Sequence, residues 1–114
     1  MSREDNILIF QNTDRMCKEN TKLKTAIRKS IAGQKLILEN DTLSEIDKKK
    51  YEKPAQVIIS KKRSFEAASA YKNQKICVHN FASATNPGGG VIRGSNAQEE
   101  CLCRCSDLLK EMKL

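Results

Sequence analysis

Three consecutive glycines, Gly88-Gly89-Gly90, separate the best strand candidate of this chain from a readable helix start. Glycines in a loop lose much conformational entropy on folding, so a run of them indicates backbone that adopts positive φ or passes close to another group. The preceding segment 75–81 has the β-branched composition of a strand, and open α/β sheets place their ligands at strand ends. The glycines therefore predict a ligand-binding loop whose bare amides close on a phosphate pair.

A helix is predicted directly after this loop. Ser95 with Gln98 fits a capping box, and Asn96 with Glu99 is an alternative register. An apolar stripe follows at Leu102, Cys105, Leu109 and Met112, with a solvated face at Arg104, Asp107, Lys110 and Glu111.

Glu99 and Glu100 fall in the first turn of that helix, roughly 100° apart around its axis, and face the glycines. Acidic residues at a helix start often only complement the helix dipole. Beside a glycine loop at a strand end, the pair instead indicates a site. A general acid must keep its proton, which desolvation or a neighbouring carboxylate favours.

The rest of the chain alternates helix and strand patterns. Helices are expected at 3–19, at 21–32 with Gly33 as the stop, and at 65–71 after a Ser64 cap; strands are expected at 35–38, 57–59 and 75–81. Such alternation favours parallel pairing through crossover connections. With 114 residues there is room for one domain. We therefore expect a single α/β domain over 1–114, with a helical segment at 1–33 and an α/β part at 34–114.

Basic residues are concentrated in one stretch. Of the net charge of +7, nearly all falls between 48 and 63, where seven Lys and Arg residues face the single acid Glu52. This stretch is either a solvated loop or a collar that attracts a polyanion such as nucleic acid or another polyphosphate. Aromatic residues make up only 4%, without Trp, so a base-stacking surface is poorly supplied.

The chain is expected to be cytoplasmic and to need neither metal nor cofactor. Its longest apolar run, 7–10, is far shorter than the ~20 residues of a membrane span, and it is also too short for an export signal. The odd count of five cysteines argues against a disulfide framework. Cys101, Cys103 and Cys105 are spaced by two on a helix, so they cannot converge on one ion.

The glycine triplet followed after seven residues by Gln98-Glu99-Glu100 resembles bacterial-type poly(ADP-ribose) glycohydrolases, which are macrodomains that cut the ribose–ribose bonds of poly(ADP-ribose). Segment 80–87, Asn-Phe-Ala-Ser-Ala-Thr-Asn-Pro, resembles the same family, as does Ser-Phe-Glu-Ala-Ala at 64–68. The resemblance implies a three-layer α/β/α fold with a mixed or parallel sheet and helices at the amino terminus. It also implies the release of ADP-ribose from the polymer.

By this resemblance, Glu100 is the catalytic acid and Glu99 holds ribose hydroxyls. Gln98 positions the turn, and Asn86 orients the terminal ribose. The glycines Gly88, Gly89 and Gly90 wrap the diphosphate.

The sequence departs from the family pattern in two places. Val91 stands where family members usually have an aromatic residue. The family fold also needs a second half with more strands, a second phosphate loop and the adenine pocket. We therefore expect an incomplete, amino-terminal part of a macrodomain that associates with the missing half or with another chain.

Two other functions stay open from the sequence. One is a macrodomain-like module that binds ADP-ribose without cleaving it. The other is a basic nucleic-acid-binding domain that uses the charges between 48 and 63.

Overall fold

The computed structural model describes residues 1–43, 45 and 50–112. Lys48 and Lys49, two members of the predicted basic stretch, lie outside the described residues. The described elements are helices α1 (Arg3–Glu19), α2 (Thr21–Ala32), α3 (Ser64–Ala68), α4 (Gln98–Arg104) and α5 (Leu108–Met112), with 3-10 turns η1 (Ser69–Tyr71) and η2 (Val91–Arg93).

The two amino-terminal helices form at the bounds that the sequence predicts. Ser2 closes a capping box with Asp5, whose backbone N–H donates to Ser2 Oγ over 3.1 Å. The Asn20 side chain accepts from the N–H of Leu23 over 3.1 Å and so starts α2. Each helix therefore begins at a side chain that satisfies backbone donors at its first turn.

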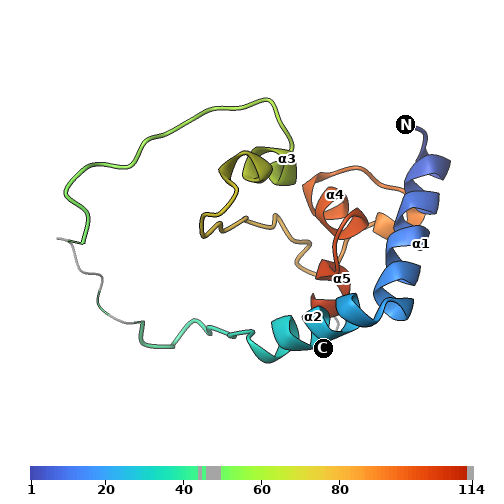
Figure 1. Cartoon of the computed structure of the whole chain (residues 1–114), viewed down its shortest axis with the longest axis horizontal. Coiled ribbons are helices and arrows are strands. Elements are labelled where there is room, and N and C mark those ends of the chain that lie inside the picture. Colours follow the sequence, from blue (N-terminus) through green and yellow to red (C-terminus); the bar gives the residue numbers. More distant parts are fainter. Residues whose placement is uncertain (44, 46–49, 113–114) are drawn as a thin grey trace.

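The predicted sheet is wrong: within the part of the chain that the structure describes, segments 35–38, 57–59 and 75–81 form no strand. A strand is stabilised by hydrogen bonds to a neighbouring strand, and these segments lie apart from one another (Figure 1). Ile59 is 96% exposed and Val57 87%. The mixed or parallel α/β/α fold is thus corrected to a helical arrangement in the described residues.

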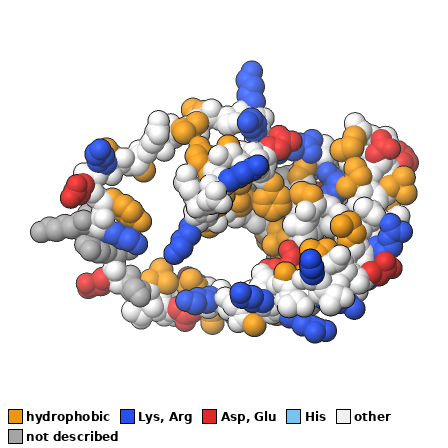
Figure 2. All heavy atoms as spheres, in the orientation of Figure 1, with side chains coloured by type: hydrophobic (Ala, Val, Ile, Leu, Met, Phe, Trp, Pro, Cys, Tyr) orange, Lys and Arg blue, Asp and Glu red, His pale blue; other side chains and the backbone are white. Residues whose placement is uncertain are grey.

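Between α2 and α3, the described residues 34–43, 45 and 50–63, called the arm below, form no helix or strand and extend away from the helical body (Figure 1). The radius of gyration is 16.7 Å, against about 13 Å for a compact domain of this length. Figure 2 shows apolar side chains on the surface of this arm, interspersed with basic ones. The apolar residues that predicted strands are therefore exposed.

The carboxy-terminal helix is shorter and more broken than predicted. Helix α4 follows Ala97 without a side-chain cap, so neither predicted capping box forms. The break before α5 lies at Ser106, whose hydroxyl donates to the Leu102 carbonyl over 2.7 Å and accepts from Leu108 N–H over 3.3 Å. A serine that bonds backbone in this way competes with helix continuation.

The core is small and lies where α1, η2, α4 and α5 meet. Val91, Cys103 and Leu109 are buried, and Phe10, Leu108 and Met112 pack around them. Cys105 of the predicted apolar stripe is exposed. Arg104, predicted on the solvated face, is only 4% exposed. Among the described residues, no helix is long and apolar enough to cross a membrane.

Candidate active site

The glycine loop, residues 86–90, turns back onto the start of α4. Gly88 and Gly89 have φ of 83° and 56°, the left-handed region that glycine tolerates best. A Cβ atom on Gly89 would lie 2.5 Å from Glu100 Oε1. The loop therefore needs glycine at position 89 both for its backbone conformation and for its close approach to a carboxylate.

Glu99 is held at both carboxylate oxygens. Oε1 accepts from Gly88 N–H over 2.8 Å, and Oε2 accepts from Ser83 N–H over 2.9 Å. The side chain is 4% exposed. Hydrogen bonds from backbone N–H groups stabilise a buried carboxylate well, because a hydrogen bond to an ionised group is stronger than one between neutral groups. Glu99 thus fastens two points of the preceding loop to α4.

Glu100 is held at one oxygen. Its Oε1 accepts from Gly90 N–H over 3.0 Å, and the residue is 8% exposed. The hydrogen bonds of Glu100 side-chain oxygens within the described residues involve Oε1 alone. Oε2 of Glu100 is consequently the one oxygen of the two carboxylates that accepts no hydrogen bond among the described residues.

All three glycine amides are engaged inside the protein. Gly88 and Gly90 donate to the glutamates, and Gly89 N–H donates to the Asn86 carbonyl over 2.8 Å. The Asn86 side chain in turn donates to the Gly89 carbonyl over 2.6 Å. The predicted contacts of these residues with a diphosphate and a ribose stay predictions, and they require these amides to exchange partners.

Gln98 ties the segment before the loop to α4. Its Oε1 accepts from Phe81 N–H over 2.8 Å, and its Nε2 donates to the His79 carbonyl over 2.7 Å. Nε2 also donates to Ser64 Oγ over 3.2 Å. One side-chain amide therefore takes the place of a neighbouring strand for two backbone groups of segment 79–81. Its predicted positioning role is compatible with this geometry and stays a prediction.

Helix α1 supports the site from the far end of the sequence. Asn6 Nδ2 donates to the Gly94 carbonyl over 3.2 Å, and Thr13 Oγ1 donates to the Arg104 carbonyl over 2.6 Å. Arg104 itself donates to Asn96 Oδ1 over 3.1 Å and to the Ser95 carbonyl. The role of Arg104 was missed from the sequence because amphipathic periodicity assigns a charged residue to the solvated face. The contacts of Asn6 and Thr13 join residues far apart in the sequence, and no local pattern marks them.

A cavity of about 300 Å³ adjoins the glycine loop. It is lined by both polar and apolar groups, from Asn86, Gly89, Gly90, Ile92, Arg93 and Leu109 among others. Gly89 and Gly90 thus contact the acidic pair and also border this cavity. Within the described ranges, no group of three or more His, Cys, Asp or Glu side chains is arranged to hold a metal ion.

Glycosidases use pairs of carboxylates, and here two glutamates at a helix start are held by a glycine loop that borders a cavity, although neither glutamate is among the residues lining it. The family model described as microbial-type PARG, catalytic domain, matches residues 5–113. The chain therefore belongs to the microbial-type poly(ADP-ribose) glycohydrolase family, and the resemblance of its glycine and Gln-Glu-Glu motifs is confirmed. At the level of the family, the activity is glycosidase-type hydrolysis. No curated protein and no solved structure matches the chain.

Proposed function

We propose that this chain acts on poly(ADP-ribose), hydrolysing ribose–ribose O-glycosidic bonds to release ADP-ribose. The observation that carries the proposal is the pair Glu99 and Glu100, each accepting a hydrogen bond from a glycine-loop amide in a chain of this family. Glu99 is 4% exposed and Glu100 8%, so solvent ions screen the charges of the two carboxylates only weakly.

Within the pair, the hydrogen bonds favour Glu100 as the reacting group. Both oxygens of Glu99 accept from backbone amides, so this residue holds the loop against α4. Its proposed contact with ribose hydroxyls rests on the family resemblance. Glu100 has one oxygen so engaged. A general acid must reach the leaving oxygen with its proton, and Oε2 of Glu100 is the oxygen left for that contact.

The proposed reaction has two proton movements on Glu100. Glu100 protonates the leaving ribose oxygen as the glycosidic bond breaks, through an oxocarbenium-like transition state stabilised by the substrate phosphate and a carboxylate. The resulting carboxylate then takes a proton from the attacking water. Gly88, Gly89 and Gly90 take the diphosphate, and Asn86 orients the terminal ribose. Gln98 holds segment 79–81, which leads into the loop.

Replacing Glu100 with Gln tests this assignment. An amide keeps an oxygen acceptor for Gly90 N–H, so folding is retained, but it carries no transferable proton. We expect the rate of ADP-ribose release from the polymer to fall by at least about 100-fold, the lower range of general acid–base contributions. Release is measured by chromatography, and ADP-ribose binding by calorimetry. Glu19→Gln, an exposed carboxylate on α1, is the matched control and keeps full activity.

Unchanged turnover in Glu100→Gln would contradict the catalytic role. Binding of ADP-ribose by the wild-type chain without any release from the polymer would favour the alternative, a macrodomain-like binding module. Neither result depends on the other, because binding and release are measured separately.

A further inference from the structure

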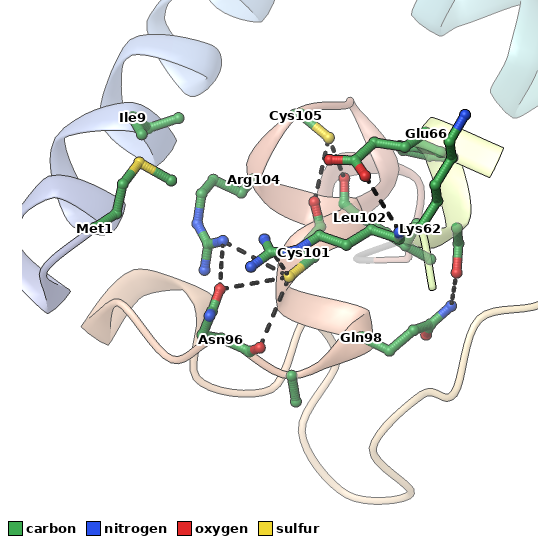
Figure 3. Close-up of a pocket in the computed structure, with 14 residues that line it drawn as sticks. Met1, Ile9, Lys62, Glu66, Asn96, Gln98, Cys101, Leu102, Arg104 and Cys105 are labelled. Atoms are coloured by element: carbon green, nitrogen blue, oxygen red, sulfur yellow. Dashed lines mark hydrogen bonds between the residues drawn. The ribbon is translucent and has the colours of Figure 1, made fainter. Parts of the chain in front are cut away.

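A second cavity, of about 490 Å³, is lined by residues of α1, α3 and α4 (Figure 3). Its walls combine apolar side chains, including Ile9, Phe65 and Leu102, with polar ones. The cavity is larger than the one beside the glycine loop. Gln98 lines it, but neither Glu99, Glu100 nor the loop glycines are among its lining residues. It is large enough for a small organic molecule.

Cys101 lines this cavity and is contacted by two guanidinium groups. Arg63 Nη1 donates to Cys101 Sγ over 3.3 Å, and Arg104 Nη1 donates to the same sulfur over 3.8 Å. The Cys101 thiol itself donates to Asn96 Oδ1 over 3.5 Å and to the Asn96 carbonyl over 3.7 Å (Figure 3). Cationic neighbours stabilise the negative charge that a cysteine sulfur carries when it attacks.

The charged side chains of the cavity are mainly positive. Lys62, Arg63 and Arg104 line it together with a single acid, Glu66. Arg104 is 4% exposed, and its Nε has no hydrogen-bond partner among the described residues. A buried guanidinium with an unsatisfied donor is costly unless an acceptor is supplied. The cavity therefore suits a small molecule that carries carboxylates.

From this arrangement we propose that Cys101 is a modification site, where small disulfides bearing carboxylates form a mixed disulfide with the protein. The sulfur of Cys101 attacks one sulfur of the reagent as its thiolate, and a new S–S bond forms while the reagent's own S–S bond breaks. The leaving thiolate takes up a proton, which balances the one that Cys101 released to solvent. Cys101 is oxidised and the leaving half of the reagent is reduced.

The other cysteines do not combine a position on the cavity wall with guanidinium contacts to the sulfur. Cys17 and Cys103 are buried, and burial raises the pKa of the Cys103 thiol to about 11. Cys105 also lines the cavity, but among the described residues no guanidinium donates a hydrogen bond to its sulfur, and partial desolvation raises the pKa of its thiol. Cys77 is exposed, but no guanidinium contact to its sulfur is present in the described residues. Cys77 therefore serves as an accessible reference thiol within the same molecule.

The test compares two disulfides of opposite charge on the wild-type chain. Glutathione disulfide carries carboxylates, whereas cystamine is cationic. Peptide mass spectrometry measures the rate of mixed-disulfide formation at Cys101 and at Cys77 in the same sample. For each cysteine, the rate with glutathione disulfide is divided by the rate with cystamine. The ratio for Cys101 is then divided by the ratio for Cys77, and this quotient cancels the intrinsic difference in reactivity between the two reagents. We expect this quotient to exceed about 5 at low salt and to fall towards 1 at high salt, because salt screens the basic side chains.

Arg63→Gln is the matched variant, because Arg63 is exposed and its substitution leaves the core intact. We expect it to bring the quotient below about 2 at low salt. Lys24 is exposed on α2 and lies outside the cavity, so Lys24→Gln is expected to show the same quotient as the wild type. A wild-type quotient near 1, or reaction confined to Cys77, would overturn the proposal. The salt comparison needs no variant, and neither measurement depends on hydrolase activity.

Discussion

Gly89 has a φ of 56°, and its α-carbon approaches a carboxylate so closely that a methyl group would lie 2.5 Å from Glu100 Oε1. The sequence indicated the need for glycine here through the triplet itself, since such runs are disfavoured without positive φ or close approach. It also placed the two glutamates towards the loop, from the 100° spacing of consecutive helix positions. The partners of each carboxylate oxygen depend on loop geometry that no spacing encodes.

Gly89→Ala is expected to destabilise the fold and to disturb Glu100 together. The left-handed conformation costs a residue with a side chain about 1–2 kcal/mol, and the contact with Glu100 adds to that cost. Urea unfolding measures the change in the free energy of unfolding. Gly33→Ala is the control, because the atoms nearest to a new Cβ there lie 3.5 Å away. Equal stability of the two variants would show that the loop adopts another conformation.

Arg104 shows the limit of inference at this scale. Amphipathic periodicity placed it on the solvated face, yet it is buried and bonded to Asn96 and to the Ser95 carbonyl. Periodicity counts a charged residue as exposed, and it carries no information about which backbone carbonyls the fold leaves near a helix. Amphipathic periodicity therefore cannot identify a buried arginine that donates to a loop carbonyl.

At the scale of elements, side chains join segments that the sequence treats as separate. The helices α1 and α2 were predicted at their observed bounds because their caps are local, at Ser2 and Asn20. The attachment of segment 79–81 to α4 depends instead on Gln98, 17 positions from Phe81. Local patterns give the helices, and contacts between distant residues give their arrangement.

Gln98→Ala is expected to loosen segment 79–81 while α4 stays folded. The variant removes the acceptor of Phe81 N–H and the donor to the His79 carbonyl. A lost hydrogen bond of this kind costs about 1 kcal/mol, so exchange of the Phe81 amide hydrogen should accelerate by about fivefold to tenfold. Gln11→Ala, on the exposed face of α1, is the control. Unchanged exchange at Phe81 would show that other contacts hold the segment.

An ion pair that titrates joins α1 to α5. Asp14 accepts from Lys110 over 2.8 Å and from Lys18 over 2.6 Å. These lysine hydrogen bonds, Lys110 foremost, hold the pKa of Asp14 below its usual value of 3.8. A lowered pKa in the folded state means that the pair stabilises the protein above pH 3.8. This contribution is lost as the pH falls through the folded-state pKa.

Asp14→Asn is therefore expected to lower the free energy of unfolding near neutral pH, and by less as the pH falls below about 3.8. The side chain is partly exposed, so we expect a loss of about 0.5–1 kcal/mol. Thermal unfolding across pH measures the difference. Lys18→Gln breaks only the pair within α1 and should have the smaller effect. A difference between wild type and Asp14→Asn that does not change with pH would contradict the ion-pair explanation.

At the scale of the whole molecule, the strand predictions failed for one physical reason. The composition of 35–38, 57–59 and 75–81 fits a strand, but a strand forms only with a partner, and these segments do not pair in the described structure. Composition reports which backbone conformation a segment tolerates. Pairing is a property of the assembled molecule, as the exposed, described residues of the arm show in Figures 1 and 2.

The central claim is that the glycine loop and the acidic pair form one ligand site, and a titration of the isotope-labelled chain with ADP-ribose tests it most directly. Amide signals in nuclear magnetic resonance spectra report each residue separately. The account predicts that the signals of Gly88, Gly90 and Glu100 shift together with a single dissociation constant, because these amides must exchange partners when a diphosphate binds. Shifts confined to the basic residues between 50 and 63, with the loop unchanged, would contradict it.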